Sequence, residues 1–340
     1  MTPAIFGISG TELTADERAF FKACDPAGYI LFARNCESKA QLRALTDALR
    51  ELHGKDQLFI CIDQEGGRVA RLRPPIWSPF PASEVFDQLY QIAPASAIEA
   101  ARVNAQALAL ELAEMGITVD CHPPLDVRQP GAHDVIGDRA LGSEPMQVAA
   151  LGRAILDGLA RGGVTGCIKH MPGHGRSMCD THKEMPTVTA SAQELATDLS
   201  PFRALNTALI GMTGHLLFTE WDTENPATLS KTIIENVIRG EIGFDGLLLT
   251  DDIDMEALEG IIPERSARSI EAGCDLVLNC WAKLDDMDGI VNALSEISDA
   301  ARARLSRVED AMSAPPDAVD VTELIAKRDA LLQVTSEAAA

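Results

Sequence analysis

One stretch of the chain, residues 168–182, concentrates side chains that can do chemistry. Three of the seven histidines, a lysine and an aspartate fall within fourteen residues, together with two glycines. Groups of this kind can transfer protons or ligate a metal ion, and they contribute little to a hydrophobic core. The stretch follows a β-branched run, 164–168, that is typical of a buried strand. We therefore expect a functional loop that is positioned by a rigid scaffold.

The bulk composition is that of a globular protein without a basic binding surface. Hydrophobic residues make up 46% of the 340 residues, which is enough for a large core. A formal net charge of −22 argues against binding to nucleic acid or to an anionic membrane, because both need a basic surface. The sequence opens without a basic leader, and no apolar run approaches the roughly 20 residues that span a bilayer. We expect a cytoplasmic protein with no nucleic-acid or membrane partner, and with its eight cysteines reduced.

Short apolar runs recur along the chain and alternate with helical patterns. Their hydrophobicity is continuous rather than alternating, which is typical of parallel strands buried on both faces. Eight strand–helix alternations favour a closed (β/α)8 barrel, an α/β fold of the TIM type, over an open doubly wound sheet. The eight predicted strands are 4–8, 29–32, 58–62, 118–121, 164–168, 208–212, 246–249 and 275–278.

Helix signals between these runs are clearest at the helix ends. The apolar stripe over 103–115 stops before Gly116, a residue type common just past a helix end. Ser230 is a good N-cap for the stripe that follows it. Pro201 suits the first turn of another helix, with Ser200 as its cap.

The patterns predict a single domain over 1–340. The barrel occupies 4–312, a proline pair ends its last helix, and 317–340 forms a helical tail packed outside. Two long irregular connections, 73–82 and 123–144, interrupt the alternation of strands and helices. Long loops in compact domains are often functional.

The active site of such a barrel lies at the carboxyl ends of its strands, which selects candidate residues by position alone. Acids and bases follow five of the predicted strands. They are Asp63, Glu65, Arg68 and Arg71; His122 and Asp126; the 168–182 stretch; His215; and Asp251, Asp252 and Asp254, while Asn279 follows the last strand.

Several of these segments resemble one known family. The sequence reads KHMPGHG at 169–175 and DTH at 180–182, DQEGGRVAR at 63–71, TDD at 250–252 and GYILFARN at 28–35. These motifs, in their order along the chain, resemble the β-N-acetylglucosaminidase branch of glycoside hydrolase family 3. The resemblance covers about residues 4–285 and implies a TIM-barrel glycosidase.

The resemblance implies a catalytic set of three residues. Asp251 would be the nucleophile of a retaining mechanism that passes through a covalent glycosyl-aspartate. His182 would be the general acid and base, since an imidazole can release and recover a proton near neutral pH. Asp180, two residues earlier, would fix the tautomer of His182 and stabilise its charged form.

Five further residues resemble the sugar-binding positions of the family. Carboxylates can accept hydrogen bonds from adjacent hydroxyls, while arginine and lysine donate to hydroxyl or acetamido oxygens. Surface ion pairs for the arginines and a hydrogen-bonded core position for the histidine are the alternatives. The five are Asp63, Arg71, Arg139, Lys169 and His170.

The resemblance implies an exo-acting enzyme that removes terminal N-acetylglucosamine from muropeptide fragments with an anhydro-muramic acid unit, in cell-wall recycling. We expect no cofactor and no metal, and favour a monomer. Three alternatives remain open. A zinc hydrolase could use His170, His174, Asp180 and His182, although the glycines and proline between them argue against a helix there. The chain could also be a non-catalytic sugar-binding scaffold, or cleave its substrate with phosphate instead of water.

Overall fold

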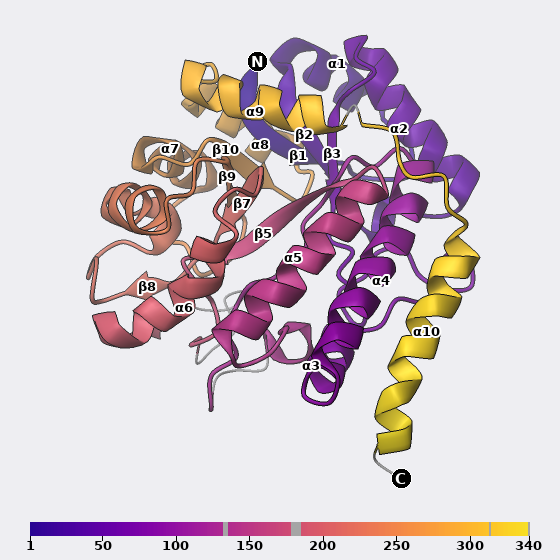
Figure 1. Ribbon diagram of the computed structural model, residues 1–340. Coiled ribbons are helices and arrows are strands. Elements are labelled where there is room, and N and C mark those ends of the chain that lie inside the picture. Colours follow the sequence, from indigo (N-terminus) through magenta and orange to yellow (C-terminus); the bar gives the residue numbers. More distant parts are fainter. Residues whose placement is uncertain (132–134, 178–184, 313, 339–340) are drawn as a thin grey trace.

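The computed structural model describes residues 1–131, 135–177, 185–312 and 314–338. Eight parallel strands close into a barrel in the order β1-β10-β9-β7-β5-β4-β3-β2 (Figure 1). Each contains part of one predicted run, so the (β/α)8 prediction is confirmed. The strands are β1 (Thr2–Gly7), β2 (Pro26–Leu31), β3 (Phe59–Ile62), β4 (Val119–Asp120), β5 (Thr165–Met171), β7 (Ile210–Thr213), β9 (Leu247–Asp252) and β10 (Leu276–Asn279).

Alternate side chains of each strand point into the barrel and out toward the helices, as the pleat requires. In β1, Ile5 belongs to the interior cluster, whereas Ala4 and Phe6 belong to the outer core under the helices. Because both faces are covered, the strands read as continuous apolar runs. One inward residue from each strand is Ile5, Ile30, Cys61, Val119, Cys167, Ile210, Leu247 and Leu276.

Helices surround the barrel, and a short two-stranded sheet lies beside it (Figure 1). The α-helices are α1 (Ala15–Cys24), α2 (Lys39–His53), α3 (Glu84–Tyr90), α4 (Pro94–Glu114), α5 (Pro145–Arg161), α6 (Ala192–Ala204), α7 (Ile262–Ala272), α8 (Leu284–Ala293), α9 (Asp299–Met312) and α10 (Val321–Ala338). The remaining elements are η1 (Ala33–Asn35), η2 (Gly137–Arg139), η3 (Ala227–Leu229), the π-helix η4 (Ile233–Glu241), and the small sheet of β6 (Thr187–Val188) and β8 (Leu217–Phe218).

Helix α9 closes the amino-terminal end of the barrel. Its Leu305 and Val308 belong to the same apolar cluster as the inward strand residues. Its Arg304 binds Asp275, just before β10, at 2.9 Å. The carboxyl ends of the strands therefore form the end of the barrel that is available for a site.

The structure confirms the helix ends that were predicted at Gly116 and Ser230, but not the one at Ser200. Helix α4 ends before Gly116, whose φ of +76° suits glycine, and the Ser230 hydroxyl accepts from the Ile233 N–H at 3.1 Å. The predicted helix start at Ser200 is wrong. Helix α6 begins after Ser191, whose hydroxyl and backbone share a capping box with Glu194, and Pro201 lies inside the helix near its end.

The predicted extra C-terminal helix is present as α10, which packs on α3 and α4. Its buried Arg328 donates to the side chain of Asn104 in α4 at 3.1 Å. No helix in the described part of the chain has the length and apolarity needed to cross a membrane.

Candidate active site

A cavity of about 900 Å³ opens at the carboxyl ends of the barrel strands. Its wall combines charged side chains with a few apolar ones. The lining residues used below are Asp63, Arg68, Arg71, Asp138, Arg139, Lys169, His170, Asp251, Asp252, Met255 and Cys280. A second cavity of similar volume lies between α4, α5 and the amino ends of β5 and β7, but alanine and leucine dominate its lining. Its one acidic lining residue, Asp157, is already bound to Arg102 at 2.7 Å.

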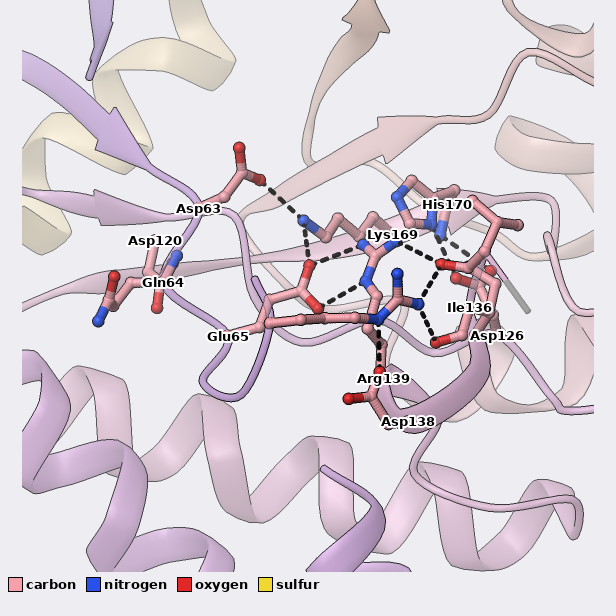
Figure 2. A network of polar contacts seen from close by, with 12 residues as sticks. Asp63, Gln64, Glu65, Asp120, Asp126, Ile136, Asp138, Arg139, Lys169 and His170 are labelled. Atoms are coloured by element: carbon pink, nitrogen blue, oxygen red, sulfur yellow. Dashed lines mark hydrogen bonds and ion pairs between the residues drawn. The ribbon is translucent and has the colours of Figure 1, made fainter. Parts of the chain in front are cut away.

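On one side of the first cavity, four charged residues form the paired cluster: Asp63, Glu65, Arg139 and Lys169. The Lys169 ammonium lies 3.0 Å from Asp63 Oδ1 and 2.8 Å from Glu65 Oε1. Arg139 donates to both oxygens of Glu65, at 2.7 and 2.8 Å (Figure 2). Arg71 adds a contact of 3.1 Å to Asp63. The cluster joins the loop after β3, the end of β5 and the connection that contains η2.

Mutual neutralisation keeps the paired cluster ionised although it is buried. Burial acts to raise the pKa of Asp63, but Lys169 and Arg71 hold it below its ordinary value. Burial opposes the ionised form of Glu65 as well, and Arg139 and Lys169 hold its pKa well below the usual range. The pKa of Lys169 is raised by the two carboxylates despite the desolvation of its ammonium. These groups therefore present fixed charges to a ligand.

His170 follows Lys169 in β5, and the buried carboxylate of Asp126 contacts its ring. The Nδ1 atom of His170 lies 2.7 Å from Asp126 Oδ2 (Figure 2). Asp126 also accepts the backbone N–H of His174 at 2.7 Å. Asp126 is completely buried, and its ring partner lines the cavity.

On the opposite side, Asp251 is the penultimate residue of β9 and lines the cavity. Its Oδ1 accepts the backbone N–H of Asp252 at 2.8 Å. Burial acts to raise the pKa of Asp251, but His170 and His215 hold it below its ordinary value. His215 is fixed in turn, with Nδ1 2.7 Å from the Thr228 hydroxyl and Nε2 2.9 Å from the carbonyl oxygen of Asp252. Asp251 is thus an ionised carboxylate on a rigid strand, as a nucleophile requires.

Next to Asp251 lies an acidic pair, Asp252 and Asp254. Burial and the neighbouring Asp254 raise the pKa of Asp252 to about 8. Asp254 accepts from the side chain of Asn279 at 2.7 Å. Arg265 interacts electrostatically with both carboxyls, but its hydrogen bonds go to the carbonyls of Ile253 and Met255. The acidic pair therefore retains a proton at neutral pH.

The cavity brings together six of the eight predicted site residues. Asp63, Arg71, Arg139, Lys169, His170 and Asp251 all line it. Asp180 and His182 lie outside the described residues, so their proposed roles remain predictions. Among the described histidines, cysteines and acidic residues, no group of three has an arrangement suited to a metal ion.

The sequence analysis did not assign a role to two residues that the structure places behind the site. Glu65 lies within the 63–71 motif, and Asp126 follows a predicted strand, so position alone identified both as candidates. Their partners are distant in sequence, and no local pattern indicates them. Of two further motif residues, Arg68 pairs with Asp138 at 2.6 Å, whereas Arg34 donates to the backbone carbonyls of Ile8 and Cys280.

Comparisons with known proteins agree with this geometry. Residues 7–312 match the glycosyl hydrolase family 3 N-terminal domain. A beta-hexosaminidase of Alkalilimnicola ehrlichii is 40% identical over 285 residues, covering 82% of this chain and 80% of the relative. One of Bordetella avium is 35% identical over 318 residues, covering 92% and 89%. The crystal structure of NagZ from Neisseria gonorrhoeae in complex with N-trifluoroacetyl-D-glucosamine superposes with a TM-score of 0.86 at 31% identity, covering 98% of each chain. The chain therefore belongs to glycosyl hydrolase family 3.

Proposed function

We propose that this protein is an exo-acting, retaining β-N-acetylglucosaminidase. The observation that supports this most directly is the ionised Asp251 at the end of β9, in a cavity whose opposite wall is the paired cluster. The relatives named beta-hexosaminidase, and the NagZ complex with an N-acylated glucosamine, support the substrate class.

In the proposed reaction, a carboxylate oxygen of Asp251 attacks the anomeric carbon and the bond to the leaving oxygen breaks. His182 donates a proton to that oxygen, which gives a covalent glycosyl-aspartate. Water then attacks the same carbon, His182 takes back a proton, and Asp251 is released. Asp180 holds the ring of His182 in the required tautomer.

The paired cluster, with Arg71 and His170, would hold the terminal sugar during this reaction. Asp63 can accept from sugar hydroxyls, and Lys169, Arg71 and Arg139 can donate to hydroxyl or acetamido oxygens. Because their ion pairs already fix these side chains, little conformational entropy remains to be lost on binding.

The proposal extends to a physiological role. The substrates would be muropeptide-type fragments with a terminal N-acetylglucosamine on an anhydro-muramic acid unit, cleaved during cell-wall recycling in the cytoplasm. The protein would act as one domain, with its barrel over 4–312, a helical tail over 317–340 and no cofactor.

Trapping the intermediate tests the central claim. A fluorinated N-acetylglucosaminide that forms a long-lived glycosyl-enzyme should add one sugar mass to the peptide that contains Asp251, and product analysis should show retention. An adduct on a different residue, or inversion of configuration, would refute the assignment. Activity that follows stoichiometric zinc and is lost to a chelator would favour the zinc hydrolase, and a sugar phosphate in phosphate buffer would favour phosphorolysis.

A further inference from the structure

Asp126 is a buried carboxylate to which the proposed reaction gives no role. It follows β4, is 0% exposed and is not among the residues that line the cavity. Even so, both of its carboxylate oxygens have hydrogen-bond partners. Its Oδ2 contacts the Nδ1 of His170, and its Oδ1 accepts the backbone N–H groups of His170 and His174 at 3.1 and 2.7 Å.

These contacts determine which nitrogen of His170 carries a proton. An ionised carboxylate can only accept hydrogen bonds. Burial acts to raise the pKa of Asp126, but His170 and the backbone donors hold it at about 2. Asp126 is therefore ionised at any working pH, and the contact of 2.7 Å requires a proton on His170 Nδ1. The Nε2 atom remains as the ring nitrogen that is available to a ligand.

Asp126 also fixes the backbone of the residues that follow His170. Its two backbone contacts span a turn that is closed by a hydrogen bond of 2.7 Å from the Gly173 N–H to the His170 carbonyl. At Gly175 the chain passes so close to the Val127 carbonyl that an added Cβ would lie 1.9 Å from its oxygen. Residues 126 and 127 thus anchor both ends of the 170–175 segment.

We propose that Asp126 is a positioning residue for saccharide binding. It holds the His170 ring with Nδ1 protonated and Nε2 turned to the sugar, and it ties the 170–174 backbone to the barrel. The inference rests on the proposed saccharide site, because His170 acts there only if a sugar occupies the cavity. Loss of the carboxylate should therefore weaken binding through His170 without removing any group that touches substrate.

The isosteric variant Asp126→Asn separates the contact with the His170 ring from the contacts with the 170–174 backbone. Its amide oxygen can still accept the two backbone N–H groups, so the fold should persist. Its amide nitrogen faces Nδ1 of His170 and is a donor, which forces the ring into the Nε2–H tautomer. Imidazole 15N NMR, with His170 assigned by comparison with His170→Gln, should show a protonated Nδ1 in wild type and an unprotonated Nδ1 in the variant.

Asp198→Asn provides the matched control. Asp198 is also buried and holds the residue that directly follows the 170–175 segment, since Arg176 Nε donates to it at 2.5 Å. Its other hydrogen bond given by the structure comes from Gln129, not from His170. This variant should keep the wild-type His170 signal and near wild-type kinetics. A general response to loosening the loop would affect both variants alike.

Kinetics then test whether Asp126 acts through His170. Asp126→Asn should lower kcat/KM by about 10- to 100-fold, mostly through KM, which is the range found when the partner that orients a metal-bound histidine is removed. In a His170→Gln background the same change should have little further effect. Unchanged His170 tautomer in Asp126→Asn, or losses that multiply in the double variant, would overturn the proposal. Failure of the proposed function looks different: wild type would cleave no N-acetylglucosaminide, while the NMR comparison would still test the tautomer.

Discussion

Two groups of buried carboxylates lie at the same end of the barrel and have opposite protonation. In the paired cluster, Asp63 and Glu65 are held ionised by Lys169 and Arg139. In the acidic pair, burial and the neighbouring Asp254 raise the pKa of Asp252 to about 8, and in the described part of the chain neither carboxyl forms an ion pair with a lysine or arginine. Burial acts to raise the pKa of the carboxyls on both sides. The difference shows that the neighbouring groups, rather than burial alone, decide the charge state.

Asp251 lies in sequence and in space next to the acidic pair but behaves like the paired cluster. His170 from β5 and His215 after β7 supply the compensation that Asp252 lacks. Two adjacent residues of one strand can therefore carry different charges. In the proposed reaction, a nucleophilic Asp251 beside a protonated Asp252 would also avoid the repulsion that two carboxylates exert on each other.

Replacing Asp251 should have the largest effect. Asp251→Asn keeps the shape and can still accept the Asp252 N–H, but it removes the nucleophilic charge. We expect kcat to fall by about 10⁴-fold or more, as when other covalent nucleophiles are removed, with the melting temperature near wild type. Turnover of a chromogenic N-acetylglucosaminide measures the effect. Rates near wild type would mean that Asp251 and the carboxylates of the paired cluster do not differ in catalytic role.

Glu65→Gln should destabilise the paired cluster, because Glu65 pairs with both Arg139 and Lys169. It removes the carboxylate that Arg139 and Lys169 share, and it leaves Asp63, which also binds Arg71, as the remaining carboxylate of the cluster. Removal of one partner from a buried ion pair typically costs about 3–5 kcal/mol, so we expect the free energy of unfolding to fall by that amount. Denaturant unfolding at pH 7 measures it. A loss below about 1 kcal/mol, the value for exposed ion pairs, would show that the cluster is not a buried network.

Asp252→Asn should instead change how stability depends on pH. The pKa of Asp252 is raised to about 8 in the folded protein, against about 3.9 when unfolded. Between these values the folded state binds more protons, so the contribution of Asp252 is present below about pH 4 and is lost as the pH rises toward 8. The asparagine variant lacks this loss, and its melting temperature should gain at least about 2 °C on wild type between pH 5 and 8. If the melting temperatures of the variant and wild type changed in parallel between pH 5 and 8, this would contradict a protonated Asp252.

Local patterns were enough to predict the barrel, because its strands are buried on both faces and the signal is strong even for β4, which has two residues. Local patterns predicted a wrong helix start at Ser200, because Pro201 is typical of a first turn. The helix instead begins after Ser191, which forms a capping box. Position at strand ends selected residues such as Asp63 and Asp251 that line one cavity in the structure. The supporting contacts could not be predicted, since Glu65 and Arg139 are 74 residues apart and Asp126 and His170 are 44 apart. Such pairs exist only once the barrel has closed.

The smallest effect is expected at an ion pair that has good geometry but is exposed. Arg68 Nε lies 2.6 Å from Asp138 Oδ1, closer than any contact of Glu65, yet the two side chains are 48% and 34% exposed. Arg68 also donates to the carbonyls of Val135 and Ile136, and these contacts survive Asp138→Asn. We expect a change in the free energy of unfolding below about 1 kcal/mol, reduced further by added salt. Unfolding measured beside Glu65→Gln provides the check. An equal loss in both variants would mean that contact distance, rather than desolvation of the charges, sets the cost of breaking an ion pair at this end of the barrel.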